Sequence, residues 1–198
     1  MRQLALGISP PPQPTLDNFV PGANAELLAQ LRNLVSGVLA ENILYVWGEA
    51  GSGKSHLLRA CAGLHAVDDV ETLDDASQID LFNRINEVRQ SGGAVLVAGN
   101  AQPAQLPLRE DLKSRLAWGL VYHVKPLTDE ERATYLRAEA GRRGMRVPDE
   151  VIGYLLTHVR RDLPTLLAIL DELDRTSLEL KRPVTLPLVR EALKEMEE

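Results

Sequence analysis

The stretch Gly48-Glu49-Ala50-Gly51-Ser52-Gly53-Lys54-Ser55 fits the pattern G-x-x-x-x-G-K-[ST] at every fixed position. The apolar and aromatic residues 43–47 before it are typical of a buried strand. Residues 56–62 after it are mostly good helix formers. A strand on one side and a helix on the other form the context in which this pattern makes a phosphate-binding loop. The alternative is a glycine-rich turn that contains Lys-Ser by chance.

The residue types of this stretch suit phosphate chemistry. Glycines let the backbone turn sharply, and the amides of the loop and of the helix N-terminus then point at phosphate oxygens. Lys54 can reach the β- and γ-phosphates, and the hydroxyl of Ser55 can ligate Mg²⁺. We therefore expect residues 48–56, which include His56, to bind an adenine nucleotide, ADP or ATP, together with Mg²⁺.

Composition narrows the class of protein. The 198 residues carry 28 acidic and 22 basic side chains, which gives a formal net charge of −6. This balance argues against the whole chain being a strong binder of duplex DNA. The single cysteine, Cys61, excludes an internal disulfide. No apolar run approaches the roughly 18 residues of a membrane span. We expect a cytoplasmic protein that does not associate with membranes.

The N-terminal residues combine prolines with apolar side chains. Four prolines lie between residues 10 and 14, where they prevent a helix and favour an extended chain. Residues 1–15 are therefore expected to form a flexible tail. Gln3, Leu4 and Leu6 lie near its tip, far from any predicted core. Two interpretations stay open, a peptide that binds a partner and a disordered end with incidental leucines.

Helical patterns flank the strands of the first part of the chain. Asn24 can cap a helix that runs to about Leu39, with Val35 and Val38 on its apolar face. Asp75 can cap a second helix over about 76–91. A short helix is expected over 110–116 and a strand over 120–124.

Two polar sites follow further predicted strands. Residues 64–69 form a short run that ends in Asp68 and Asp69, which favours a strand whose acids hold Mg²⁺. A loop that contains two acids is the alternative. The unbroken apolar run 94–98 is expected of an internal parallel strand. Asn100 follows its carboxyl end, where ligands bind in open α/β sheets.

The pattern changes at Pro126 and is purely helical afterwards. Thr128 and Glu131 form a capping box for a helix to about Arg143. Further helices are expected from Asp149, from Asp162 and over about 187–197. We therefore expect an α/β part followed by a helical part.

These stretches together resemble the AAA+ ATPases and, more narrowly, the DnaA family of replication initiators and their regulatory relatives. The resemblance covers nearly the whole chain and includes a box, residues 112–119, similar to the one that carries an arginine finger in the family. Its other stretches are residues 3–6, 19–24, 48–55, 80–85 and 188–193.

The resemblance implies a fold and a set of residue roles. The fold is an AAA+ P-loop three-layer α/β core with a parallel sheet, at 16–126, and an all-helical lid, at 127–198, preceded by the tail 1–15. The roles it implies are phosphate and Mg²⁺ binding for Lys54 and Ser55, Walker B for Asp68 and Asp69, sensor 1 for Asn100 and an arginine finger in trans for Arg115.

Three departures from the family pattern affect these expectations. The segment between the P-loop helix and Walker B is short, so the sheet is expected to be one strand short. Pro164 occupies the position of the sensor 2 arginine, with Arg160 and Arg161 nearby as substitutes. The initiator's helix-turn-helix domain has no counterpart in these 198 residues, so we expect no direct sequence-specific DNA binding.

The function implied by the resemblance is regulatory. With the DNA-loaded sliding clamp of DNA polymerase III, its β subunit, such a protein stimulates ATP hydrolysis by the initiator DnaA and prevents over-initiation of replication. Gln3, Leu4 and Leu6 would bind the clamp, close to the nucleoid and replisome. We expect at most a weak ATPase by itself, because no Glu follows Asp at Walker B. A free-standing AAA+ ATPase or helicase-loader-like protein, a non-catalytic adaptor and a homodimer stay open.

Overall fold

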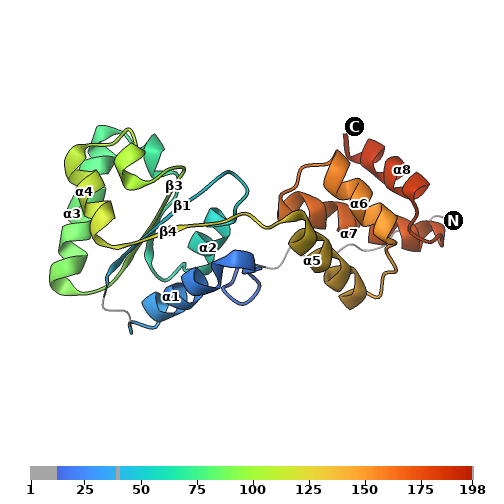
Figure 1. Ribbon diagram of the computed structural model, residues 1–198, viewed down its shortest axis with the longest axis horizontal. Helices are drawn as coiled ribbons and strands as arrows, with labels where there is room; N and C mark the ends of the chain where they lie inside the picture. Colours follow the sequence, from blue (N-terminus) through green and yellow to red (C-terminus); the bar gives the residue numbers. More distant parts are fainter. Residues whose placement is uncertain (1–12, 39–40, 198) are drawn as a thin grey trace. The chain divides into compact units, whose positions relative to one another are not determined.

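The computed structural model describes residues 13–38 and 41–197 (Figure 1). The chain divides into two compact units, one formed by Gln13–Pro126 and one that includes Leu127–Glu198. The tail residues Gln3, Leu4 and Leu6 lie outside the described residues. Because each unit has an apolar core of its own, the two units are described separately.

A parallel sheet forms the centre of the first unit. Its strands are β1 (Ile43–Trp47), β2 (His65–Val67), β3 (Val95–Gly99) and β4 (Leu120–His123), in the order β2-β3-β1-β4. Strand β1 pairs with β3 on one side and β4 on the other. Every residue of β3 is buried, as the unbroken apolar run predicts, whereas the edge strand β2 has three residues and none is buried.

Helices cover both faces of this sheet. On one face, α1 (Ala25–Val35) and α2 (Lys54–Ala60) pack against a core that includes Leu44, Val46 and Leu96. On the other face, α3 (Asp75–Ser91) and α4 (Glu110–Trp118) pack against Tyr45, Val95 and Val97. Successive side chains of a strand point to opposite faces, so each central strand contributes to both cores. The three layers confirm the expected α/β fold class.

Asn24 is the N-cap residue of α1, as predicted, but its side chain makes no capping hydrogen bond to the helix. Asn24 also ends the short 3₁₀ turn η1 (Gly22–Asn24). Its amide instead donates to the carbonyl of Lys125 at 2.8 Å and accepts from the amide of Lys125 at 2.8 Å. The helix also ends at Val35, which is 49% exposed, before the predicted end. Asn24 therefore joins the start of α1 to the chain that follows β4.

The predicted cap of α3 is displaced by one residue. The carboxylate of Asp74 accepts a hydrogen bond from the amide of Ser77 at 2.8 Å, and Asp75 is the first helical residue. A cap must lie outside the helix with an extended backbone, and Asp74 has that conformation.

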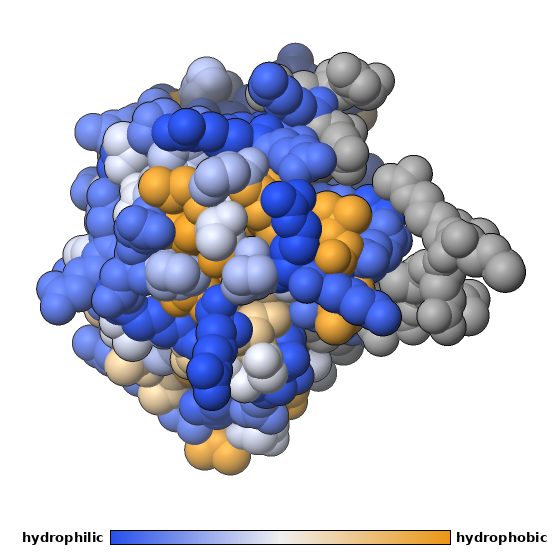
Figure 2. Space-filling model, turned by 90° about the vertical axis from the view of Figure 1, so that its right-hand side faces the viewer, coloured by the Kyte–Doolittle hydropathy of each residue, from blue (hydrophilic) through white to orange (hydrophobic). Residues whose placement is uncertain are grey.

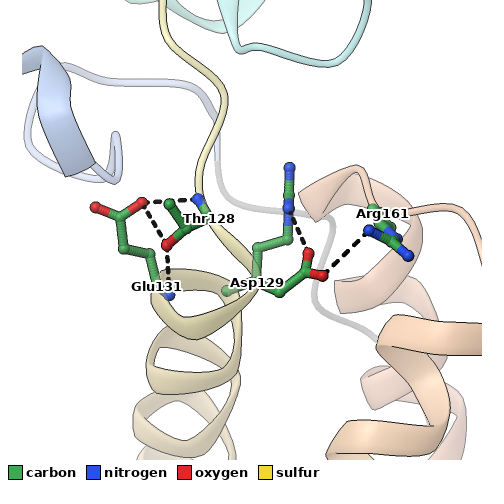
Figure 3. Close-up of polar contacts among 5 residues, drawn as sticks. Thr128, Asp129, Glu131 and Arg161 are labelled. Atoms are coloured by element: carbon green, nitrogen blue, oxygen red, sulfur yellow. Dashed lines mark hydrogen bonds and ion pairs between the residues drawn. The ribbon is translucent and has the colours of Figure 1, made fainter.

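The second unit is all-helical. Its helices are α5 (Asp129–Arg142), α6 (Asp149–His158), α7 (Leu163–Leu180) and α8 (Leu186–Glu197), and they enclose a core that includes Leu136, Leu155 and Leu166. The capping box is confirmed, because Thr128 Oγ1 accepts from the amide of Glu131 at 3.2 Å and Glu131 Oε2 accepts from the amide of Thr128 at 2.7 Å (Figure 3). Figure 2 views the right-hand side of Figure 1 and shows apolar side chains gathered among hydrophilic ones.

Among residues 13–38 and 41–197, no helix is long and apolar enough to cross a membrane.

Candidate functional site

The P-loop connects β1 to α2 by a backbone that only glycine adopts easily. Gly51 and Gly53 have φ angles of 79° and 103°, in the left-handed region. At Gly48, a methyl group would lie 2.6 Å from the carbonyl oxygen of Val124. The glycines of the sequence pattern are therefore required by backbone conformation and by close packing.

Lys54 is held inside this loop. The residue is only 9% exposed, and its Nζ atom donates hydrogen bonds to the carbonyl oxygens of Gly48 at 2.8 Å and of Glu49 at 3.1 Å. Burial of an ammonium group is costly unless such partners are present. Ser52 is also buried, and its hydroxyl has no hydrogen-bond partner within the described residues. The loop thus combines a buried cation with a free hydroxyl.

The residues just before α1 pack on the loop, a contact that the sequence analysis did not predict. The ring of Phe19 lies 5.5 Å from that of His56, and a methyl group on Gly53 would lie 2.8 Å from Phe19 Cε2. His56 Nε2 lies 3.0 Å from the carbonyl oxygen of Thr15, which can accept its proton. No local pattern signals this contact, because the partners are far apart in the sequence.

The predicted Walker B acids directly follow the edge strand β2. Asp68 is half-buried, and its carboxylate accepts a hydrogen bond from the amide of Asp69 at 3.0 Å. Asp69 is exposed, with φ of 47°. In the part of the chain that the structure describes, no three His, Cys, Asp or Glu residues gather into a metal-binding group. A Mg²⁺ ion here would therefore depend on nucleotide phosphates and water as well as on Ser55 and Asp68, as Mg²⁺ commonly does.

Asn100 lies beside the P-loop at the end of β3. The amide of Gly48 donates to the carbonyl of Gly99 at 3.3 Å, which brings the two strand ends together. The amide of Asn100 donates to Glu71 Oε2 at 3.3 Å. Glu71, in the 3₁₀ turn η2 (Val70–Thr72), was not singled out from the sequence. The structure thus brings the P-loop, the two acids and Asn100 to the carboxyl edge of the sheet.

Tyr45 of β1 contacts the residues that follow β3 at this edge. It is fully buried, and its hydroxyl donates to the carbonyl oxygen of Ala101 at 2.6 Å. Burial, and secondly the negative charge of Glu71, raise the pKa of Tyr45. The tyrosine therefore stays protonated and keeps its hydrogen bond.

Arg115 lies apart from this group. Arg115 belongs to the last turn of α4. Gly119, which follows α4, packs closely on the start of β1, since a methyl group at Gly119 would lie 2.3 Å from the carbonyl oxygen of Ile43. The guanidinium carbon of Arg115 lies 3.6 Å from the ring centroid of Trp118 and 5.2 Å from that of Phe82. Arg115 is therefore near the amino edge of the sheet, and the P-loop lies at the carboxyl edge.

The two arginines considered for sensor 2 form ion pairs within the helical unit. Arg161 Nη1 lies 3.1 Å from Asp129 Oδ2 (Figure 3), and Arg160 Nε lies 3.4 Å from Asp162 Oδ2. Pro164 lies in the first turn of α7. Each arginine would have to leave its carboxylate to contact a phosphate.

Known proteins with this fold were found by comparison of structures. Domain III of DnaA from Thermotoga maritima matches with a TM-score of 0.75 and 22% identity, over 94% of this chain and 98% of that one. AMPPCP-bound DnaA from Aquifex aeolicus matches with a TM-score of 0.70 and 20% identity, over 93% and 70%. RuvB from Thermotoga maritima matches with a TM-score of 0.68 and 16% identity, over 92% and 72%. These likenesses show that the fold is that of the AAA+ proteins.

The helical unit narrows the assignment. Residues 129–193 match the family model described as "Hda, lid domain". The helical unit thus resembles the lid of Hda, and the fold of the chain is similar to that of DnaA domain III.

Proposed function

We propose that this chain is a nucleotide-binding regulator that supplies Arg115 in trans to the ATPase of the replication initiator DnaA. An arginine finger stabilises the charge that develops on the transferred phosphoryl group. Guanidinium suits this role because it is planar, always charged and able to bind two oxygens at once. The Hda-type lid and the DnaA-like fold support this proposal.

The position of Arg115 is the observation that carries the proposal. Strand β1 spans five residues, so its amino end and the P-loop are separated by roughly 15 Å. Arg115 lies about one helical turn from the amino edge, and its side chain packs towards Trp118 at the end of α4. A nucleotide in the P-loop of the same chain is therefore out of its reach. The arrangement favours a phosphate on a second molecule.

Nucleotide bound to this chain would act as a structural group or a switch. Lys54 and Ser52 would contact phosphate, Ser55 and Asp68 would hold Mg²⁺, and Asn100 would act as sensor 1. The AMPPCP bound to DnaA from Aquifex aeolicus supports an adenine nucleotide. Asp69 stands where a catalytic Glu is usual, so hydrolysis by this chain itself is expected to be slow.

The tail completes the proposed mechanism. Gln3, Leu4 and Leu6 would bind the sliding clamp of DNA polymerase III, so that inactivation of the initiator depends on a clamp already loaded on DNA. The core at 16–126 and the lid at 127–198 would then face the initiator at the replisome, in the cytoplasm. No sequence-specific contact with DNA is needed in this scheme.

The test is a reconstituted hydrolysis reaction. Purified chain and DNA-loaded clamp are added to ATP-bound initiator, and release of phosphate is followed over time. We expect hydrolysis to accelerate only when chain, clamp and DNA are all present. Rapid turnover by the chain without initiator would instead indicate a free-standing AAA+ ATPase.

A further inference from the structure

Two aromatic and two basic side chains of α3 and α4 lie together. The guanidinium carbon of Arg115 lies 3.6 Å from the ring centroid of Trp118 and 5.2 Å from that of Phe82. The guanidinium carbon of Arg89 lies 4.7 Å from the same Trp118 ring. Trp118 is 47% exposed, which is unusual for so large an apolar side chain. We call these four residues, Phe82, Arg89, Arg115 and Trp118, the arginine–aromatic cluster.

Arg115 differs from Arg84 of α3 and from Arg109, the residue before α4, which both pair with a carboxylate. Arg84 pairs with Glu87 at 2.7 Å, and Arg109 pairs with Asp111 at 2.9 Å. Among the described residues, Arg115 contacts no carboxylate, and its Nε atom is buried without a hydrogen-bond partner. A buried donor that lacks a partner is costly in a folded protein, and it calls for an explanation.

The stack of the Arg115 guanidinium on Trp118 is one explanation for the buried Nε atom, and it leaves the terminal N–H groups without a carboxylate partner in the described part of the chain. A carboxylate would hold the side chain still, but it would also neutralise the charge and occupy the N–H donors. The face of an indole attracts the cation through its quadrupole and uses none of those donors. An arginine held in this way has already lost part of its side-chain entropy before it meets an anion.

We propose that Trp118 is a positioning residue for Arg115, which it holds in a defined orientation with its terminal N–H groups free for the phosphates of a nucleotide bound to a partner molecule. This inference rests on the proposed function of Arg115. It assigns to Trp118 no contact with the reacting atoms. Its effect passes through the guanidinium and should therefore appear in the rate of the chemical step.

The experiment compares Trp118→Leu, Trp118→Phe and Arg115→Ala in the hydrolysis reaction with ATP-bound initiator and DNA-loaded clamp. Trp118→Leu should lower the maximal stimulated rate by roughly three- to thirty-fold, the range of a cation–π contact, at an unchanged apparent affinity for the initiator. Trp118→Phe keeps an aromatic face and should restore most of that rate. The matched control is Arg84→Ala, which removes an arginine of α3 outside the arginine–aromatic cluster. It should change neither the maximal rate nor the apparent affinity.

The double variant Arg115→Ala, Trp118→Leu separates positioning from a direct contact. If Trp118 acts through Arg115, the double variant should be no slower than Arg115→Ala alone. A further loss in the double variant, or an unchanged rate in Trp118→Leu, overturns the role of Trp118 while Arg115→Ala still reports on the function. If Arg115→Ala itself keeps full stimulation, the proposed function fails.

A measurement without the initiator tests the contact itself. In NMR spectra, the Nε–H proton of Arg115 should be shifted by the ring current of Trp118, with its signal assigned by its loss in Arg115→Lys. The shift should disappear in Trp118→Leu and persist in Arg84→Ala. A signal at the position of a free arginine in the wild-type chain would contradict the stack.

Discussion

The Nζ atom of Lys54 donates a hydrogen bond to the carbonyl oxygen of Gly48 at 2.8 Å, across the P-loop that both residues belong to. The ammonium is therefore already held within the loop, with little side-chain freedom left to lose on binding. A phosphate group that enters the loop would meet a fixed positive charge. This arrangement is the basis of the first prediction.

Lys54→Ala should abolish binding of ADP and ATP, because it removes the main positive charge of the loop. Isothermal calorimetry with Mg²⁺ and each nucleotide measures this directly. Lys194→Ala, which changes an exposed lysine of α8, is the matched control and should bind as the wild type does. Unchanged affinity in Lys54→Ala would show that this loop is not the nucleotide site.

Gly99→Ala should destabilise the core unit. The added methyl group would lie 2.3 Å from the hydroxyl oxygen of Tyr45 and 3.2 Å from Glu71 Oε2. Because Tyr45 is fully buried and bound to Ala101, it cannot move away without loss of that hydrogen bond. We expect a cost of about 1–3 kcal/mol in the free energy of unfolding. Urea unfolding measures it, and Tyr45→Phe in the same chain should recover part of the loss. An equal cost with and without the tyrosine hydroxyl would contradict this explanation.

Glu139 should stabilise the lid in a pH-dependent way. Its carboxylate is almost buried and accepts hydrogen bonds from Arg142 at 2.7 Å and from Arg143 at 2.8 Å, and Arg143 also pairs with Asp171. The hydrogen bond from Arg142 is the main cause that lowers the pKa of Glu139, with a further contribution from Arg143. A lowered pKa means that the folded unit favours the charged carboxylate.

Glu139→Gln should therefore cost about 1–3 kcal/mol at neutral pH. The stabilisation is fully present above the pKa of the unfolded chain and is lost as pH falls through the lowered pKa of the folded chain. The difference in unfolding midpoint between wild type and variant should thus narrow in acid. Glu191→Gln, an exposed position on α8, is the control. A difference that stays constant down to the acid range would contradict the role of Glu139.

Removal of residues 1–9, or replacement of Gln3, Leu4 and Leu6 by Ala, should abolish clamp binding. The amide of Gln3 can hydrogen-bond at the rim of a groove, and each leucine contributes roughly 1.5–3 kcal/mol if fully buried. Surface plasmon resonance with immobilised clamp measures the affinity, and Gln13→Ala is the control. Equal affinity with and without the segment would mean that the tail has no part in clamp recognition.

Local patterns in the sequence predicted most elements of the fold. The P-loop, the buried strand β3 and the capping box of Thr128 and Glu131 depend on residues close together in the chain, so their signals are local. The side-chain partner of Asn24 was not predicted, because Lys125 lies 101 residues away. The same limit hid the packing of Phe19 on the P-loop and the hydrogen bond from Asn100 to Glu71.

For the same reason, most residues of the candidate site were predicted from the sequence, but most of their contacts were not. Spacing within a motif predicted roles for Lys54 and Ser55, and family resemblance predicted one for Arg115. Neither could show that Arg115 lacks a carboxylate partner among the described residues and rests on Trp118, because cation–π contacts have no fixed sequence spacing. The absence of a Glu after Asp68 was likewise visible in the sequence alone.

The central claim is that Arg115 completes the ATPase of a partner molecule. Its most direct test is single-turnover hydrolysis of radiolabelled ATP on the initiator, with DNA-loaded clamp and either wild-type chain or Arg115→Ala. We predict that Arg115→Ala folds, binds nucleotide and binds the clamp as the wild type does. Its stimulation of hydrolysis should fall by about 10³-fold or more, or to the unstimulated rate, as for other fingers supplied in trans. Stimulation by Arg115→Ala at a rate close to that of the wild type would contradict the account.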